Sequence, residues 1–335
     1  MRILAVVLVS LLFFSCEKKE LPVPKYVPPA APADTASGST AGPLIVAQVD
    51  MSSDYRNQVW FSLSENRIVY ANLKTDWDLA FECSPSGWHL MLNGSKSMKV
   101  FKTNFEKLED VKDTVGLGSN GKADVPSGNL DSTAVGSWQL DNKVYVINLG
   151  YNELGKLIGY IKLKLISVDN NGYTFEFGDV YGTETYQGSV LKNAQKNFVA
   201  YSFASRMQIN TVEPDKSSYD LCFTNYTHLF LEPLQYYQVT GVLSNSYKTR
   251  IARFSGIPFY KMTKKDTAGK TFVNDRNGIG YDWKSFNLEK NLYSVNLNMC
   301  YIIQDSKGFY YKLHFLDFYN SSGLKGSPKF EFQRL

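Results

Sequence analysis

The sequence runs through one ordered series of strand-like segments twice. Trp77-Asp78-Leu79-Ala80-Phe81 reappears as Tyr219-Asp220-Leu221-Cys222-Phe223, and Phe175-Glu176-Phe177 reappears as Phe330-Glu331-Phe332. The offset between partners grows smoothly from 142 residues at the first pair to 155 at the last, as small insertions in connecting loops would produce. This period is far too long for a solenoid. The repeat therefore predicts two tandem copies of one domain.

The first residues have the composition of an export signal. Arg2 is followed by an apolar run over residues 3–14 that only Ser10 interrupts, and Ser15-Cys16 closes it. The run is too short to span a bilayer as a helix, so we expect residues 1–15 to be a cleaved signal peptide. A cysteine directly after a small residue resembles a bacterial lipobox, which predicts that Cys16 is lipidated and anchors the chain to a membrane. The alternative is a plain secretory signal with an incidental cysteine.

Residues 16–43, which begin at the lipidated cysteine, differ in composition from the rest of the chain. Six prolines lie within residues 21–43 among Ala, Ser, Thr and Gly, and large apolar residues are scarce. Such a segment buries too little apolar surface to offset the entropy of ordering it, so we expect a disordered, semi-extended tether. The tether would hold the folded part of the chain away from the membrane.

The remaining sequence has the periodicity of a β protein. Aromatic residues make up 14% of the chain. Tyr311, Leu313 and Phe315 alternate with polar residues, a period of two that is typical of strands, and turn signals such as Asn170-Asn171-Gly172 separate such runs. We therefore expect an all-β fold of two antiparallel domains, each a sandwich or open barrel. Their expected ranges are residues 44–190 and 191–335, joined near residues 187–197.

Charge, cysteine usage and motifs argue against several classes of function. The formal net charge of +4 is spread thinly without a basic block, so nucleic-acid binding is not expected. Cys83, Cys222 and Cys300 are odd in number and lack CxxC spacing, which favours buried small hydrophobes over disulfides or a metal site. The sequence has no GxSxG, HExxH or P-loop motif, so we expect neither catalytic residues nor an enzyme.

Two pairs of carboxylates recur in the repeat. Asp78 and Asp220 each stand beside a large aromatic residue at the start of a strand. We expect them to have a structural role, accepting backbone N–H bonds at a turn. Glu176 and Glu331 alternate with phenylalanines, and we expect both to face solvent.

Several of these segments resemble the HmuY family of haem-binding surface lipoproteins of the Bacteroides group. The resemblance rests on the Asp-Leu-x-Phe strand of each copy, the strand at residues 311–319, the closing Phe330-Glu331-Phe332 and the opening strands at residues 59–63 and 199–203. Glu17-Lys18-Lys19-Glu20 also resembles the charged tag that directs lipoproteins of this group to the cell surface. The resemblance implies two tandem HmuY-like domains in a lipid-anchored protein of the outer membrane, exposed at the cell surface.

The resemblance also implies haem capture. Members of this family hold the porphyrin at an open end of the β fold with two axial side chains, histidines or methionines, from two loops. The implied function is a lipoprotein that binds haem or a related porphyrin and passes it to a TonB-dependent outer-membrane transporter. The alternative is a module on the same scaffold that has lost haem ligation and recognises a glycan, a peptide or a protein partner.

The haem ligands that the resemblance points to lie in the second copy, between residues 228 and 262 and facing the segment from 283 to 298. Because residues 284–298 contain no His and no Met, we expect at most one strong ligand, Met262 or His228, with a tyrosine as a further option. Each has a plainer interpretation, Met262 as core filler and His228 as an ordinary hairpin residue. We expect His314 to face solvent on the polar side of its strand, and His89 lies in a strand-like run.

Overall fold

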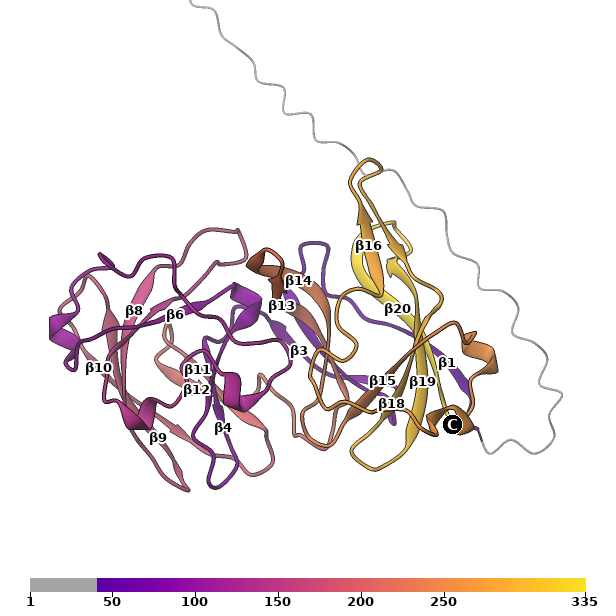
Figure 1. The fold of residues 1–335 in the computed structure, drawn as a ribbon, viewed down its shortest axis with the longest axis horizontal. Helices are drawn as coiled ribbons and strands as arrows, with labels where there is room; N and C mark the ends of the chain where they lie inside the picture. Colours follow the sequence, from indigo (N-terminus) through magenta and orange to yellow (C-terminus); the bar gives the residue numbers. More distant parts are fainter. Residues whose placement is uncertain (1–40) are drawn as a thin grey trace, which may run out of the picture.

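The computed structural model describes residues 41–335, which form two β lobes that lie side by side (Figure 1). Apart from short 3₁₀ turns, these residues form only strands and loops, so the expected all-β fold is confirmed. No helix in this range is long and apolar enough to cross a membrane. The expected signal peptide, Cys16 and the tether up to residue 40 lie outside the described residues.

Lobe one, on the left of Figure 1, is a sandwich of two antiparallel sheets with strand orders β12-β11-β4-β5 and β10-β9-β8-β7-β6. Its strands are β4 (Leu79–Glu82), β5 (Leu90–Leu92), β6 (Lys99–Lys102), β7 (Tyr145–Asn148), β8 (Tyr160–Val168), β9 (Gly172–Asp179), β10 (Tyr186–Leu191), β11 (Phe198–Ser202) and β12 (Met207–Ile209). Alternate residues of each strand point inward, as a strand period of two requires. Phe81 and Tyr201 from one sheet thus meet Leu163 and Phe175 from the other in a common core.

Lobe two is built in the same way, with strand orders β14-β13-β2-β3 and β1-β20-β19-β18-β15. Its strands are β1 (Leu44–Gln48), β2 (Asn57–Ser62), β3 (Arg67–Leu73), β13 (Leu221–Leu231), β14 (Leu234–Ser244), β15 (Arg250–Ser255), β18 (Met299–Gln304), β19 (Tyr310–Tyr319) and β20 (Lys325–Arg334). At its centre the ring of Trp283 stacks on that of Phe315, with centroids 3.8 Å apart. A separate hairpin of β16 (Lys284–Asn287) and β17 (Leu292–Val295) projects from this lobe (Figure 1).

The two lobes share one strand order, but their opening strands are exchanged. β1, β2 and β3 precede lobe one in the sequence and pair within lobe two, whereas β10, β11 and β12 open the second half of the chain and pair within lobe one. Phe61 thus lies opposite Leu221, and Tyr201 lies opposite Leu79. The strand pairing crosses the expected boundary at residue 190 in both directions, and the division into domains 44–190 and 191–335 stays a prediction.

In each lobe an aspartate fastens the end of one exchanged strand, β11 in lobe one and β2 in lobe two. Asp78 Oδ2 accepts a hydrogen bond from the N–H of Phe203 at 2.7 Å, and Asp220 Oδ2 accepts one from the N–H of Leu63 at 2.7 Å. The structural role expected for both aspartates is therefore confirmed. Their partners come from the other half of the chain, which the repeat in the sequence does not reveal.

The lobes pack through the outer faces of the sheets that contain β13 and β4. A cluster of Trp60, Ala200, Val212, Tyr219 and Cys222 fills this junction. All three cysteines of the described range are buried and form no disulfide, which confirms their expected role as small hydrophobes.

The outer face of β19 is also buried, contrary to the expectation for His314 and Glu331. His314 is only 4% exposed, its ring stacks on Phe259 with centroids 4.1 Å apart, and its Nε2 is hydrogen-bonded to Glu331 Oε1. A small apolar cluster around the turn η5 (Phe259–Lys261) covers this face. The expectation of solvent exposure is wrong. Alternation of side chains along a strand shows which residues share a face of the sheet, but it does not show whether a loop covers the outer face.

Candidate functional site

The long hairpin of β13 and β14 carries a row of aromatic side chains. Tyr226, His228 and Phe230 alternate along β13, and Tyr237 lies opposite His228 on β14. Alternate residues of a strand point to the same side and lie roughly 7 Å apart. The ring of Tyr281, from the segment before β16, packs against His228 with centroids 4.9 Å apart. We call these five residues the aromatic face.

The opposite side of this hairpin rests on lobe one. Thr227 Oγ1 donates a hydrogen bond to the carbonyl of Gly94 at 2.9 Å, and Gln238 Nε2 donates one to the carbonyl of Ser95. Lys99 Nζ lies 5.7 Å from the centroid of the Tyr236 ring. These contacts hold the hairpin in place, so the aromatic face is presented on a fixed support.

Tyr226, His228 and Tyr281 of the aromatic face line a hollow of about 650 Å³, which is within the range of small-molecule sites. Its lining residues are Tyr226, His228, Ile251, Arg253, Thr271, Val273, Asp275, Asn277, Gly278, Gly280, Tyr281 and Asp282. Arg253 and Asp282 form an exposed ion pair with an N···O distance of 2.6 Å. The hollow therefore combines aromatic walls with one guanidinium, two carboxylates and one imidazole.

His228 lines this hollow with a partly buried imidazole ring. Its Nδ1 is buried and has no hydrogen-bond partner in the described part of the chain. Phe230 and Tyr281 contact the ring edge-to-face, with centroids 4.7 and 4.9 Å away. Burial lowers the pKa of the His228 imidazole, while the charge of Asp282 acts in the opposite direction. The lowered pKa favours the neutral ring, and a neutral imidazole can donate a lone pair to a metal.

Met262, the other ligand candidate, does not line this hollow. It is buried beside η5, and its carbonyl accepts a hydrogen bond from Lys312 Nζ at 3.2 Å. In lobe one Lys162 Nζ donates to the carbonyl of Val111 at 2.9 Å, at the equivalent place after the turn η2 (Leu108–Asp110). The equivalent residue in lobe one is a valine, and Met262 itself lies in a buried apolar cluster. Its surroundings are therefore those of a core residue. Its role as a haem ligand stays a prediction that its position does not favour.

The segment after Trp283 does not face His228 as the sequence led us to expect. Residues 284–298 form the β16–β17 hairpin and the turn into β18, and they contribute none of the lining residues. Tyr281 and Asp282, which precede Trp283, border the hollow instead. The structure thus brings His228 together with residues before the tryptophan.

The other two histidines are both hydrogen-bonded to carboxylates. His314 is bonded to Glu331, and His89 Nδ1 is bonded to Glu82 Oε2, with its ring stacked on Trp88 at a centroid distance of 3.9 Å. Neither histidine lines the hollow beside the aromatic face. Within residues 41–335, no group of three or more His, Cys, Asp and Glu residues could hold a metal ion.

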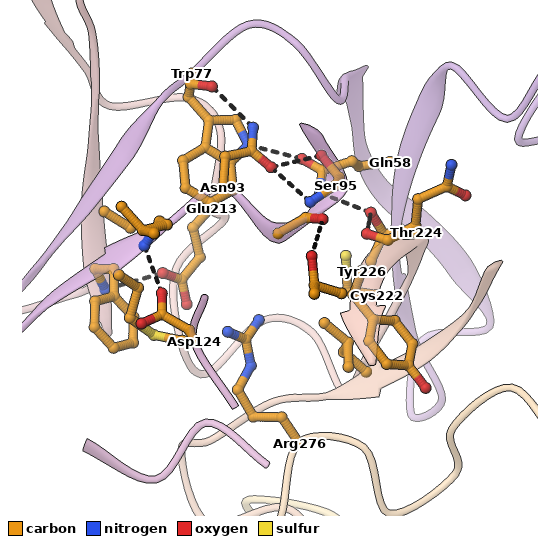
Figure 2. A pocket seen from close by; sticks show the side chains of 18 of the residues that line it. Gln58, Trp77, Asn93, Ser95, Asp124, Glu213, Cys222, Thr224, Tyr226 and Arg276 are labelled. Atoms are coloured by element: carbon orange, nitrogen blue, oxygen red, sulfur yellow. Dashed lines mark hydrogen bonds between the residues drawn. The ribbon is translucent and has the colours of Figure 1, made fainter. Parts of the chain in front are cut away.

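An interior cavity of about 100 Å³ lies at the junction of the lobes (Figure 2). Trp60, Trp77 and Leu243 form part of its apolar lining, and Gln58 Nε2 donates a hydrogen bond to Thr224 Oγ1 at 2.8 Å on its wall. Such a volume holds several water molecules or a small organic group.

Charged groups also face this interior cavity. The guanidinium of Arg276 points into it, with Asp124 and Glu213 to one side (Figure 2). Burial raises the pKa of Asp124 to about 6, opposed by hydrogen bonds from two backbone N–H groups at 2.5 and 2.6 Å. Burial also raises the pKa of Glu213, whose carboxyl accepts a hydrogen bond from Tyr219 Oη at 2.6 Å. Each carboxyl group already has local donors, so we interpret the cavity as part of the junction between the lobes.

The sequence indicated His228 as a candidate ligand but did not indicate the residues around it. The alternation of Tyr226, His228 and Phe230 is visible in the sequence and could have indicated a shared strand face. Tyr281 and Arg253 reach the hollow from distant elements, and no local pattern marks them.

Comparison with known proteins identifies the family. The model of the HmuY protein family matches residues 54–332 in one stretch that spans both lobes. Among curated proteins, none matches the sequence. The division into two HmuY-like domains stays a prediction.

Three solved structures are similar at low sequence identity. Apo PinO from Porphyromonas gingivitis is 9% identical, covers 88% of this chain and 97% of its own, and has a TM-score of 0.30. The apo HmuY analog of Tannerella forsythia is 10% identical, covers 88% of this chain and 98% of its own, and has a TM-score of 0.24. A protein of Bacteroides vulgatus ATCC 8482 described as HmuY-like and heme-binding is 12% identical, covers 51% and 90%, and has a TM-score of 0.21. Scores this low carry no functional argument, so the family assignment rests on the family model.

Proposed function

The chain belongs to the HmuY family, and on this premise we propose that it binds haem or a related porphyrin at the aromatic face. The observation that carries the proposal is the environment of His228. Burial lowers the pKa of its imidazole, its Nδ1 has no hydrogen-bond partner within residues 41–335, and the ring borders a hollow of about 650 Å³.

The chemistry of a porphyrin matches this hollow. A porphyrin has a large flat apolar ring, and aromatic side chains offer flat or edge-on contacts to such rings. Its iron requires an axial donor, for which imidazole is suited. Tyr226 and Tyr281 would supply the ring contacts, and His228 would supply the donor.

The hollow offers one strong iron ligand. His228 is the only His, Met or Cys among its lining residues. Tyr226 also lines it, and its hydroxyl is buried without a hydrogen-bond partner in the described range. Burial raises the pKa of Tyr226, so this phenol stays protonated at neutral pH and is a poor iron ligand. We therefore expect a high-spin or mixed spectrum.

The charges of the hollow set a limit on affinity. Asp275 and Asp282 oppose the carboxylates of haem, and Arg253 already pairs with Asp282. A propionate would have to compete with Asp282 for the guanidinium. We therefore expect weaker binding than two axial ligands and a free cation would give.

The location and partner that we propose follow from the N-terminal signals and the family. A lipid on Cys16 would anchor the chain to the outer membrane, with the folded part at the cell surface at the end of the tether. Haem captured there would pass to a TonB-dependent transporter. The lipobox-like Ser15-Cys16 and the proline-rich tether support this arrangement.

Titration of the purified protein with haemin tests the proposal. We expect a sharpened Soret band and a high-spin or mixed signature. His228→Ala should weaken binding at least about tenfold, which corresponds to about 1.4 kcal/mol. Met262→Leu is the matched control, because it conserves core volume and should leave haemin binding unchanged.

Two results would contradict the proposal. One is a His228→Ala variant that binds haemin as well as the wild type. The other is a low-spin spectrum with two histidine ligands, which this hollow does not offer.

A further inference from the structure

A third hollow lies where the turn between β14 and β15 meets the turn between β18 and β19. It measures about 660 Å³. Its lining residues are Asn197, Ser246, Tyr247, Lys248, Arg250, Asn274, Gln304, Asp305, Ser306 and Gly308. We call it the Tyr247 groove. It shares no lining residue with the hollow beside the aromatic face.

The groove carries positive charge around one aromatic ring. Lys216 Nζ and Lys248 Nζ lie 5.0 and 5.2 Å from the centroid of the Tyr247 ring, which is half-buried. Lys248 and Arg250 are exposed, and neither forms an ion pair with any residue between 41 and 335. Arg250 Nη2 also donates a hydrogen bond to the carbonyl of Phe272 at 3.4 Å, but no acidic side chain in this range forms an ion pair with either cation.

The one acidic residue of the groove is already engaged. Asp305 is buried, and its Oδ1 accepts hydrogen bonds from the N–H groups of Lys307 at 2.9 Å and Phe309 at 2.8 Å. The carboxylate thus holds the β18–β19 turn and does not neutralise Lys248 or Arg250 by direct contact. The net positive charge of the groove favours an anionic ligand.

The equivalent turn of lobe one shows that this arrangement is specific to lobe two. Asn93 and Asn245 begin the two turns in the same way, each accepting at Oδ1 the N–H of the residue two positions later. In lobe one the next lysine, Lys96, turns inward and forms a buried ion pair with Asp78. In lobe two Lys248 is exposed beside the groove instead.

The length of the turn explains the difference. Arg250, the first residue of β15, lies five positions after Asn245, whereas Lys99, the first residue of β6, lies six positions after Asn93. Lys248 has the left-handed conformation (φ 61°) that Ser97 has in lobe one (φ 59°). The shorter turn leaves Asp220 without a lysine and frees the lysine for the groove.

We propose that the Tyr247 groove binds an acidic saccharide, a sugar chain that carries carboxylate groups. Lys248 and Arg250 would bind the carboxylates through charge-assisted hydrogen bonds. The Tyr247 ring already has two lysine ammonium groups near it, and it would contact the sugar through the part that these lysines leave uncovered. Gln304 and Ser306 would hydrogen-bond the sugar hydroxyls.

Isothermal titration calorimetry with tetragalacturonate tests this inference, with a neutral galactose tetrasaccharide as the control ligand. We expect the acidic chain to bind and the neutral chain to bind at least about tenfold more weakly. Lys248→Asn should weaken binding of the acidic chain about tenfold, since it removes the charge while asparagine tolerates the left-handed backbone. Tyr247→Ala should weaken binding about fivefold through the lost ring contact.

Lys265→Asn is the matched control, because it removes an exposed lysine outside the groove and should leave binding within about twofold of the wild type. Inorganic phosphate reports whether the groove is only an anion site. The proposal would be overturned if both tetrasaccharides bound equally, or if phosphate competed as effectively as the acidic chain. Equal effects of Lys248→Asn and Lys265→Asn on binding would contradict it as well. Absence of binding at concentrations on the order of 1 mM would also overturn it.

The outcome is independent of haem binding. His228→Ala should leave titration with tetragalacturonate unchanged, and Lys248→Asn should leave titration with haemin unchanged. A failure of one proposal therefore does not decide the other.

Discussion

Replacing Asp220 by asparagine is expected to stabilise the protein at pH 8. Asp220 is 4% exposed, its Oδ2 accepts the N–H of Leu63, and no ion pair within residues 41–335 includes it. Burial raises the pKa of Asp220 to about 7, against the effect of the Leu63 hydrogen bond. Asparagine keeps an oxygen for Leu63 and removes the buried charge.

The magnitude follows from the change in pKa. Raising the pKa of an aspartate from 3.8 to about 7 corresponds to roughly 4 kcal/mol once the group is ionised. Between these pH values the folded protein keeps a proton that the unfolded chain has lost, so stability falls as the pH rises through this window. Asp220→Asn should therefore raise the free energy of unfolding by up to about 4 kcal/mol at pH 8, and by less than about half of that at pH 5.

Urea unfolding followed by tryptophan fluorescence at pH 5 and pH 8 measures this effect. Asp78→Asn is the matched control, because Asp78 has the equivalent place in lobe one but is paired with buried Lys96. Removing one partner of a buried ion pair costs about 3–5 kcal/mol, so this control should be destabilised. Destabilisation by both substitutions, or a gain at Asp220 that is equal at the two pH values, would refute the reasoning.

Two further predictions concern the exchanged strands and the anchor. A fragment of residues 76–214 contains every strand of lobe one and should fold alone, whereas a fragment of residues 197–335 lacks β1, β2 and β3 and should not fold. Circular dichroism and the cooperativity of thermal melting distinguish a folded fragment from an unfolded one. A folded 197–335 fragment would contradict the strand exchange. Cys16→Ser should move the protein from membrane to soluble fractions, because the lipid on this cysteine is the anchor that we propose. Continued membrane association of that variant would show that another feature anchors the chain.

Part of the candidate site could be predicted from the sequence. His228 stands in a run whose aromatic residues alternate, and that alternation indicates one side of a strand. Met262 was an equally good candidate in the sequence, because methionine in a turn and methionine in a core have the same local signature. Only the packing around η5, and the valine at the equivalent place in lobe one, separate the two.

The sequence by itself determined the strands and their two-faced character, because these depend on side-chain period. It also indicated a structural role for Asp78 and Asp220 but not their partners, which lie in the other half of the chain. It also carried the resemblance to the HmuY family. The tertiary structure decided which lobe receives each opening strand. Similar strand patterns recur in both halves of the chain, so an opening strand has a suitable pairing partner in either lobe. Only the connections between the lobes determine which partner it takes.

Tertiary structure also decided which faces and residues are enclosed. His314 and Glu331 alternate with core residues as solvent-facing side chains do, yet a loop more than fifty residues earlier in the chain covers them. His228 and Tyr281 likewise lie more than fifty residues apart and meet only in the folded chain. Burial and contact are set by the packing of distant segments, and no period along a single strand encodes them.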